Sequence, residues 1–296
     1  MSRLPPVLLL TGATGFLGRR LAGPFAKTWT VVRASRTAAG PGAADLDLSD
    51  PDSIRRCFDA AAPRAVVHAG GMADPDLCER EPALARRVNV DAVKTLAGLC
   101  GASGARLVHF STDLVFDGER GWYSEDDAPK PAGVYAAGKL DSEEAALTRA
   151  PGACALRVSS CYGRPLGGRP SFVDGMRDKL SRGEPVGGFV DQWRTSTAAD
   201  QLPEVLAALL DGPEPVAEGV LHWGGSERLT RFDAARVYAR VMGFDEGLVR
   251  PARAVDVKFL SPRPRDTSLD SSRLAAALGI APWSYETGFA ALKAAR

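Results

Sequence analysis

The chain has 296 residues, 45% of them hydrophobic, and its 37 basic residues almost balance its 36 acidic ones. This length supports one large α/β domain with a smaller lobe, and the balanced charge gives no indication of a nucleic-acid partner. The longest apolar runs are too short for a membrane span or a signal peptide, so we expect a cytoplasmic protein with reduced cysteines and no bound metal.

The first half of the chain alternates short apolar runs with helical patterns. Strands are predicted at residues 7–10, 30–34, 65–69, 106–110 and 154–158, and helices at 15–26, 51–61, 82–100 and 134–148. Such alternation predicts βαβ units, and nearly unbroken apolar strands fit a parallel sheet covered on both faces. The sequence therefore predicts an α/β fold, with a Rossmann-type doubly wound parallel sheet in residues 1–160.

The pattern changes after residue 160. Helices are predicted at about 172–182, 199–210 and 231–242, a strand at 219–223, and two short helices in the tail. We expect residues 161–197 and 226–296 to form a small, discontinuous substrate-binding lobe. A segment at about 198–225 is expected to return to the main sheet.

A glycine-rich loop, residues 11–18 with the sequence T-G-A-T-G-F-L-G, joins the first strand to the first helix. In a G-x-x-G-x-x-G loop the first glycine permits a tight turn, the second lets the backbone approach a pyrophosphate, and the third lets the helix pack on the strand. The helix N-terminus offers unpaired N–H groups to the phosphates. The loop predicts a dinucleotide site formed by Gly12, Thr14, Gly15, Phe16, Leu17 and Gly18. The alternative is a purely structural turn.

The end of the second strand indicates which dinucleotide is bound. NAD-binding folds usually carry an acid here to hold the ribose 2′-hydroxyl, but this chain has Arg33, Ser35 and Arg36. A guanidinium can hold a 2′-phosphate that a carboxylate would repel, so we expect NADP(H). The alternative is that both arginines are plain surface residues. Further on, Asp47 and Leu48 are expected at the edge of the adenine.

Tyr135 and Lys139 open the predicted helix 134–148. Residues four apart share a helix face, and a nearby ammonium favours the phenolate, which brings a phenol with a pKa of about 10 toward working pH. Ser111, Thr112 and Asp113 follow the fourth strand, where the carboxyl ends of parallel strands form the ligand crevice. The set predicts proton transfer to a carbonyl oxygen during hydride transfer.

Several segments together resemble a known family. They are the glycine loop 11–18, the stretch S-T-D-L-V-F-D-G at 111–118, Y-A-A-G-K at 135–139, D-Q-W-R-T-S-T at 191–197 and R-P-R-D-T-S-L-D at 263–270. In this order they are similar to the extended short-chain dehydrogenase/reductases, and within these to the dTDP-4-dehydrorhamnose reductase group. The similarity covers nearly the whole chain.

The resemblance implies reduction of the 4-keto group of a dTDP-linked 6-deoxyhexose by NADPH. It implies a catalytic triad of Thr112, Tyr135 and Lys139, with Ala69 and Gly70 on the nicotinamide side and Asn89 bracing the site. Tyr135 and Lys139 are also expected to contact the cofactor. The substrate-binding residues implied are Asp113, Val115, Ser160, Gln192, Trp193 and Arg263. Dimers are common in the family, so a homodimer is a further expectation.

The chain departs from the group on the substrate side. The group commonly has R-T-S-W after the fifth strand, whereas residues 157–160 read R-V-S-S. The loop 69–76 is rich in glycine, and Ser196 replaces a proline. These differences leave the sugar and the nucleotide open, while the cofactor loop and the triad are intact.

Two other kinds of function remain as alternatives. One is a different short-chain-type ketoreductase or an epimerase, although the missing acid on the second strand favours exchangeable NADP(H) over a retained NAD. The other is a non-catalytic, NADP-binding regulatory subunit resembling the β subunit of methionine adenosyltransferase. His68 and His109 are interpreted as buried strand histidines, not as metal ligands.

Overall fold

The computed structural model describes residues 5–164, 166–167, 171–210 and 217–295. The chain divides into two compact units. The first comprises Met1–Ser111, Gly133–Leu156 and Pro203–Leu221, and the second comprises Thr112–Ala132, Arg157–Leu202 and His222–Arg296. Residues 211–216 of the predicted returning segment lie outside the described residues. That the first unit binds the cofactor and the second the substrate stays a prediction.

A seven-stranded sheet with the order β3-β2-β1-β4-β5-β6-β9 forms the centre of the first unit. The strands are β1 (Val7–Thr11), β2 (Thr30–Ala34), β3 (Ala43–Ala44), β4 (Ala65–His68), β5 (Arg106–Thr112), β6 (Cys154–Val158) and β9 (Gly219–Trp223). The β1–β2, β1–β4, β2–β3 and β4–β5 pairs are parallel. Since sheet order reverses next to β1, this is the doubly wound arrangement that the alternating pattern predicts, and the predicted fold class is confirmed.

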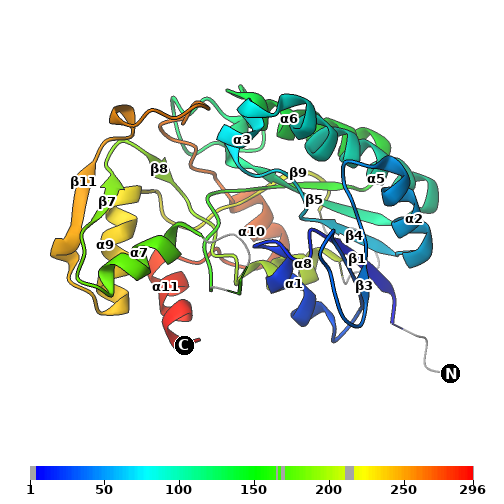
Figure 1. Cartoon of the computed structure of the whole chain (residues 1–296), viewed down its shortest axis with the longest axis horizontal. Coiled ribbons are helices and arrows are strands. Elements are labelled where there is room, and N and C mark those ends of the chain that lie inside the picture. The colour runs from blue at the N-terminus through cyan, green and yellow to red at the C-terminus, as the bar shows by residue number, and fades with distance from the viewer. Residues whose placement is uncertain (1–4, 165, 168–170, 211–216, 296) are drawn as a thin grey trace. The chain divides into compact units, whose positions relative to one another are not determined.

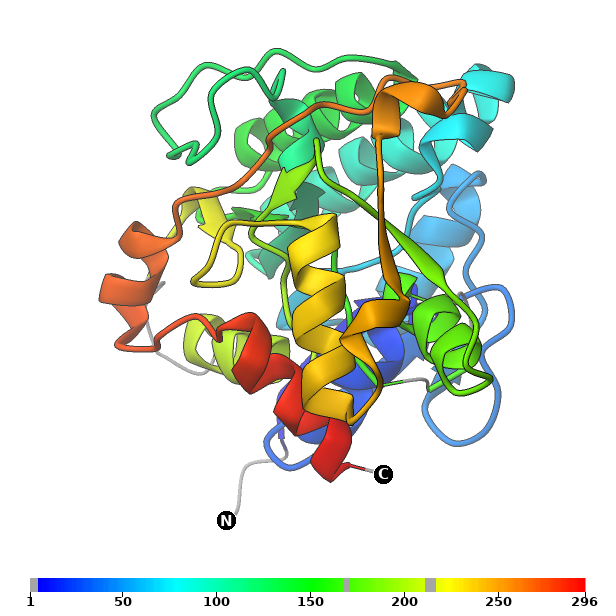
Figure 2. The same cartoon turned by 90° about the vertical axis from the view of Figure 1, so that its left-hand side faces the viewer.

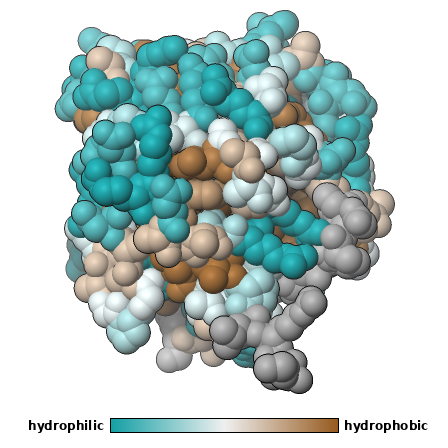
Figure 3. All heavy atoms as spheres, turned by 90° about the vertical axis from the view of Figure 1, so that its right-hand side faces the viewer, coloured by the Kyte–Doolittle hydropathy of each residue, from teal (hydrophilic) through white to brown (hydrophobic). Residues whose placement is uncertain are grey.

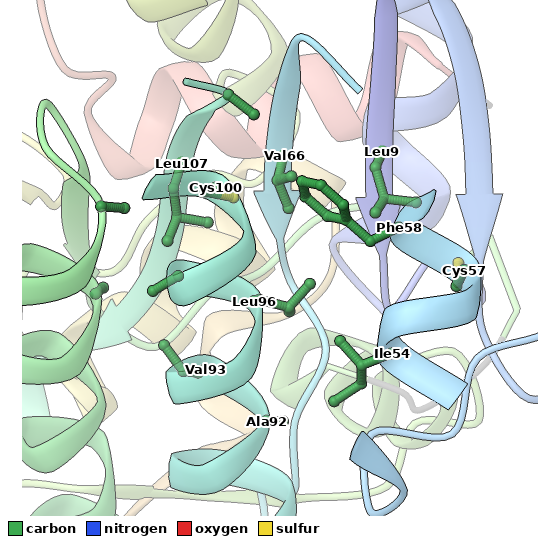
Figure 4. Packing of buried hydrophobic residues seen from close by; sticks show 14 of the residues in the cluster. Leu9, Ile54, Cys57, Phe58, Val66, Ala92, Val93, Leu96, Cys100 and Leu107 are labelled. Carbon is green, nitrogen blue, oxygen red and sulfur yellow. The ribbon is translucent and has the colours of Figure 1, made fainter. Parts of the chain in front are cut away.

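Helices cover both faces of this sheet. They are α1 (Gly18–Phe25), α2 (Pro51–Ala61), α3 (Pro75–Arg80), α4 (Pro82–Arg86), α5 (Ala92–Ser103), α6 (Val134–Arg149) and α8 (Leu202–Leu210). Helices α2, α5 and α6 lie on one face, and α1 and α8 on the other (Figure 1). Between α2, α5 and the sheet, Phe58, Ile54 and Leu96 pack with Leu9 and Val66 in a buried apolar cluster (Figure 4). Burial of this cluster holds the helices on the strands.

The long helix expected at 82–100 is interrupted. A π-helical turn, η1 (Arg87–Asp91), separates α4 from α5. Asn89 sits in this turn and is buried. Because π-turns shift the side chains of a helix and are frequent at functional sites, the interruption bears on the site described below.

The second unit contains short strands and its own core. Strand β7 (Val186–Phe189) pairs in parallel with β11 (Val249–Ala252), and β8 (Trp193–Arg194) pairs antiparallel with β10 (Leu229–Thr230). Its helices are α7 (Phe172–Leu180), α9 (Arg231–Met242), α10 (Ser272–Leu278) and α11 (Tyr285–Ala294), with 3-10 turns η2 (Asp113–Val115), η3 (Glu246–Leu248) and η4 (Ala254–Asp256).

Helix α9, yellow in Figure 2, lies between α7 and α11 of this unit. Tyr162, Tyr238 and Phe289 pack together at the centre of its core. The four strands are too short for a period-two pattern to stand out in the sequence, which is why the sequence predicts none of them.

The surface is mixed in polarity. On the face that lies to the right in Figure 1, hydrophilic residues surround a smaller hydrophobic area (Figure 3). Among the helices of the described residues, none is long and apolar enough to span a bilayer.

Candidate functional site

The glycine loop turns tightly between β1 and α1. Gly12 has φ +67°, and a Cβ atom on it would lie 2.6 Å from the backbone of Gly70. A Cβ on Gly18 would lie 2.3 Å from the carbonyl oxygen of Gly12. Both positions therefore require glycine, the first for its left-handed backbone and close approach, the second because α1 packs directly on the turn. A Cβ on Gly15 would have more room, 3.1 Å from the Gly12 oxygen.

The ends of β1, β2 and β4 bring several of the predicted cofactor residues together. The Thr14 hydroxyl donates to the Ser35 hydroxyl at 3.2 Å. A Cβ on Gly70 would lie 2.7 Å from the Leu48 side chain. The backbone of the loop after β4 is thus packed between Gly12 and Leu48. There is no room for a side chain at Gly12 or Gly70.

Arg33 and Arg36 differ in their surroundings. The Arg33 guanidinium donates to the carbonyl oxygens of Ala39 and Pro41, both at 2.9 Å, so the following loop fixes its position. Arg36 is exposed. Hydrogen bonds from Ser49 and the nearby positive charge of Arg36 lower the pKa of the Asp47 carboxyl. Asp47 is engaged with the turn before α2, and its expected contact with an adenine stays a prediction.

Asn89 holds the loop that follows β4. Its side-chain oxygen accepts a hydrogen bond from the Met72 N–H at 2.7 Å, and its amide nitrogen donates to the Met72 carbonyl oxygen at 3.0 Å. Asp74 caps α3 by accepting from two backbone N–H groups. The glycine-rich loop 69–76 is therefore fixed at Met72 by a two-way amide contact, which is a bracing geometry of the kind implied for Asn89.

Tyr135 and Lys139 lie one turn apart near the start of α6. Gly133 precedes the helix with φ +90° and offers no side-chain cap. Instead, the Glu79 carboxylate accepts from the Val134 N–H at 2.8 Å, where a negative charge stabilises a helix N-terminus. This contact fixes the turn that carries Tyr135.

Lys139 is buried beneath the carboxyl end of β5. Its ammonium donates to the Phe110 carbonyl oxygen at 2.6 Å and lies 3.2 Å from Nε2 of His109. Burial lowers the pKa of Lys139 to about 8, and the negative charge of Glu143 opposes this shift. Glu143 accepts a short hydrogen bond from Ser111. An ammonium with a lowered pKa can exchange protons at physiological pH, which suits a residue that assists a phenol.

Thr112 ends β5 and begins the second unit. Its hydroxyl accepts from the Leu114 N–H at 3.2 Å and lies 3.2 Å from an Asp113 oxygen, to which it donates. Its role as the triad hydroxyl stays a prediction.

Asp113 is 3% exposed, and its carboxylate has other partners. It accepts from the Ser159 hydroxyl at 2.8 Å and the Thr267 hydroxyl at 2.5 Å, and Nε of Arg194 lies 3.5 Å away. The Asp113 carboxylate therefore joins three distant segments of the second unit. The substrate contact implied for Asp113 stays a prediction, while its observed contacts are all within the protein.

Two further predicted substrate residues occupy different settings. Val115 is fully buried, so its side chain has no open face. Ser160 lies just after β6 with φ +29°, a backbone conformation that non-glycine residues rarely adopt, and its hydroxyl accepts from Arg231 at 3.0 Å. Strain of this kind gathers at functional positions. Sequence analysis did not single out Arg231, because a lone arginine at the start of a helix forms no motif.

A pocket of about 630 Å³ opens within the second unit. Its lining includes Asp191, Gln192, Arg253, Arg263 and Arg265, together with apolar residues of the stretch 254–262. The Asp191 carboxylate accepts a hydrogen bond from the Ala254 N–H at 2.7 Å. The pocket lining carries three guanidinium groups and one carboxylate, and that carboxylate is already hydrogen-bonded. The resulting excess of positive charge suits an anionic ligand.

Gln192 is 3% exposed, and its Nε2 lacks a hydrogen-bond partner among the described residues. Buried amides are rarely left without a partner, and this donor belongs to a residue of the pocket lining. Trp193, another predicted substrate residue, lies with its ring 5.0 Å from the Arg265 guanidinium and 5.2 Å from that of Arg228. Stacking of Trp193 on a base stays a prediction.

Ser196, which replaces a proline of the resembled group, has gained contacts. Its N–H donates to the Tyr285 hydroxyl at 3.0 Å, and its own hydroxyl oxygen accepts from the same group at 2.8 Å. Proline has no N–H and could not donate. The substitution therefore ties this segment to α11.

The sheet order, the glycine loop and the tyrosine–lysine pair on α6 are those of an extended short-chain dehydrogenase/reductase. The chain matches the model of the RmlD substrate binding domain over residues 7–295, and it belongs to the RmlD family.

Similar proteins include reductases and a subunit of methionine adenosyltransferase. The chain is 33% identical over 277 residues to methionine adenosyltransferase 2 subunit beta of Pongo abelii, covering 90% of this chain and 81% of that protein. It is 33% identical over 276 residues to a probable dTDP-4,6-dihydroxy-2-methyloxan-3-one 4-ketoreductase of Streptomyces antibioticus, covering 93% and 90%. The fold matches that of dTDP-4-dehydrorhamnose reductase from Bacillus anthracis in complex with NADP, with a TM-score of 0.89, 21% identity, and coverage of 99% and 100%. The resemblance to the dTDP-4-dehydrorhamnose reductase group is thus confirmed.

Proposed function

We propose that this protein is an NADPH-dependent reductase of the 4-keto group of a nucleotide-linked 6-deoxy sugar. The observation that carries the proposal is the placement of Tyr135 and Lys139 on α6, with the Lys139 ammonium buried and hydrogen-bonded at the end of β5. A surface pair at this spacing would leave the ammonium in water. Here the ammonium is instead buried and hydrogen-bonded within the protein, which supports a functional role for the pair.

The proposed chemistry divides between the cofactor and the chain. Bound NADPH supplies a hydride to the carbonyl carbon. Tyr135 donates the phenolic proton to the carbonyl oxygen, which gains charge as the carbon is reduced. Lys139 stabilises the phenolate that remains, because an adjacent ammonium favours the charged form of a phenol. Thr112 donates a hydrogen bond to the same oxygen.

The first unit supports NADP(H) as the cofactor. Side chains are excluded from Gly12, Gly18 and Gly70 by contacts under 3 Å, which is the close backbone approach that a pyrophosphate needs. At the end of β2, Ser35 and the exposed Arg36 would contact a 2′-phosphate. Arg33, held by two loop carbonyls, would add positive charge beside it.

The pocket of the second unit supports a nucleotide-linked substrate. Guanidiniums of Arg263 and Arg265 fit a diphosphate, and the unpartnered amide of Gln192 fits a further acceptor on the ligand. The related Streptomyces protein carries the name of a probable dTDP-4,6-dihydroxy-2-methyloxan-3-one 4-ketoreductase. A cytoplasmic location and a homodimer belong to the same proposal.

The test is NADPH consumption by the purified protein with a freshly generated dTDP-4-keto-6-deoxyhexose. We expect turnover in the wild type and at least a hundredfold loss in Tyr135→Phe, since general acid catalysis contributes about 10²–10⁴-fold. Tyr123→Phe is the matched control, because it removes the same hydroxyl from the second unit. Turnover that persists in Tyr135→Phe would contradict the proposed proton donor.

A second candidate is a non-catalytic subunit that binds NADP(H). The similarity to methionine adenosyltransferase 2 subunit beta favours it. Tight NADPH binding without turnover of any 4-keto sugar nucleotide would support this candidate over the reductase. Retention of stoichiometric NAD through purification would instead favour an epimerase.

A further inference from the structure

Two buried histidines lie next to Lys139 in the first unit, one of them in contact with its ammonium and the other stacked on the first. His68 on β4 and His109 on β5 are register partners, and their rings stack with centroids 5.2 Å apart. Both are at most 1% exposed. The proposed reaction uses neither, yet His109 is within hydrogen-bonding distance of the Lys139 ammonium.

The hydrogen bonds around Nε2 of His109 compete with one another. Ser142 Oγ lies 2.8 Å from Nε2, and Lys139 Nζ lies 3.2 Å from it. The Ser142 hydroxyl donates its one proton to the Lys139 carbonyl oxygen at 2.6 Å. Ser142 therefore faces Nε2 as an acceptor, while the ammonium can act only as a donor.

These two neighbours demand opposite tautomers of His109. An ammonium at Lys139 needs a bare Nε2, which places the ring proton on Nδ1. If the lysine is neutral, Nε2 can carry the proton and donate to Ser142. Burial and the positive charge of Lys139 lower the pKa of His109 well below its ordinary value, so the ring is neutral in both cases and only its tautomer can change.

We propose that His109 is a positioning residue for Lys139: its neutral ring accepts a hydrogen bond from the ammonium at Nε2, and its tautomer follows the charge of the lysine. With the Phe110 carbonyl, the ring then fixes two of the three N–H groups of Lys139. The third is left to act on Tyr135. The catalytic meaning rests on the function proposed above, whereas the contact itself does not.

Other groups around Lys139 have defined roles. Glu143 lies on the same helix, accepts from Ser111, and favours the charged lysine. His68 accepts or donates at Nδ1 with Thr11 at 2.6 Å and is neutral, since burial lowers its pKa to about 3. Tyr135 lies one turn before Lys139. In the part of the chain that the structure describes, none of these side chains hydrogen-bonds to Nε2 of His109, and its Nδ1 is buried without a hydrogen-bond partner. The contacts that distinguish the two tautomers are therefore those of the lysine and Ser142 with Nε2.

The test is nitrogen NMR of the imidazole rings in uniformly ¹⁵N-labelled protein. The chain has three histidines, and His68→Phe and His222→Phe assign the signals. His222 is an internal reference: its Nδ1 lies 3.1 Å from the Tyr123 carbonyl oxygen, and its Nε2 lies 3.3 Å from Arg157. It must therefore carry its proton on Nδ1.

At pH 6.5 we expect His109 to show the same Nδ1–H pattern as His222. In Lys139→Met the donor is gone, and the pattern should switch to Nε2–H, whereas Ser142→Ala should keep Nδ1–H. In the wild type, raising the pH through the pKa of Lys139, about 8, should produce the same switch without any substitution. An Nε2–H pattern in the wild type at pH 6.5, or an Nδ1–H pattern that does not respond to the lysine, would overturn the inference.

Turnover gives a second readout where the proposed reaction is observed. We expect kcat to fall about tenfold in His109→Phe, the effect of losing one hydrogen bond to a charged group. His109→Gln, which restores an acceptor oxygen, should recover most of it. If the wild type has no reductase activity, the proposed function fails while the NMR experiment still decides the contact.

Discussion

Replacing Asp113 distinguishes a substrate contact from a structural one. The carboxylate is 3% exposed, accepts from Ser159 and Thr267, and faces the Arg194 guanidinium, which is equally buried. Asp113→Ala would remove the carboxylate whose charge acts most strongly on that guanidinium. Removing one partner of a buried ion pair costs about 3–5 kcal/mol, so we expect the free energy of unfolding to fall by that amount.

The assay is urea unfolding followed by tryptophan fluorescence, with NADPH affinity measured on the same samples. Asp113→Asn keeps an acceptor oxygen but loses the charge, and it should lie between the wild type and Asp113→Ala. Glu246→Gln is the control, because its pair with Arg236 is solvent-exposed and contributes less than about 1 kcal/mol. An Asp113→Ala protein with unchanged stability and a raised KM for the sugar nucleotide would refute the structural role and favour direct substrate binding.

Two further predictions concern the first unit. Gly12→Ala should lower NADPH affinity at least tenfold and cost about 1–3 kcal/mol of stability, because φ is +67° and the new Cβ would collide with Gly70. The measurement is a titration of each variant with NADPH. Gly23→Ala on α1 is the control, and it should leave the affinity unchanged because a Cβ there meets nothing within 4 Å. Lys139 has a folded pKa of about 8 against an ordinary 10.5, so the unfolded chain binds more protons between these values, and the free energy of unfolding should rise by about 3 kcal/mol from pH 8 to 10.5. Denaturation curves of Lys139→Met across this range should lack the rise, and an equal rise in both proteins would assign it to other groups.

The sequence by itself determined the features that depend on near neighbours. Strand and helix periods gave β2, α2 and β6 with their observed bounds. The spacing of Gly12, Gly15 and Gly18 identified the turn, since only glycine tolerates its conformation and contacts. Tyr135 and Lys139 were placed on one helix face because four residues make about one turn.

Only the tertiary structure decided which side chains meet across long stretches of chain. The contact of Asp113 with Thr267 joins residues 154 positions apart, and that of Lys139 with His109 joins residues 30 apart. Neither leaves a period or a motif, because each partner satisfies only its local strand or helix pattern. A buried charge must find a partner wherever the fold brings one. The same reason explains why nothing in the sequence pointed to Arg231 until the segments around it were packed.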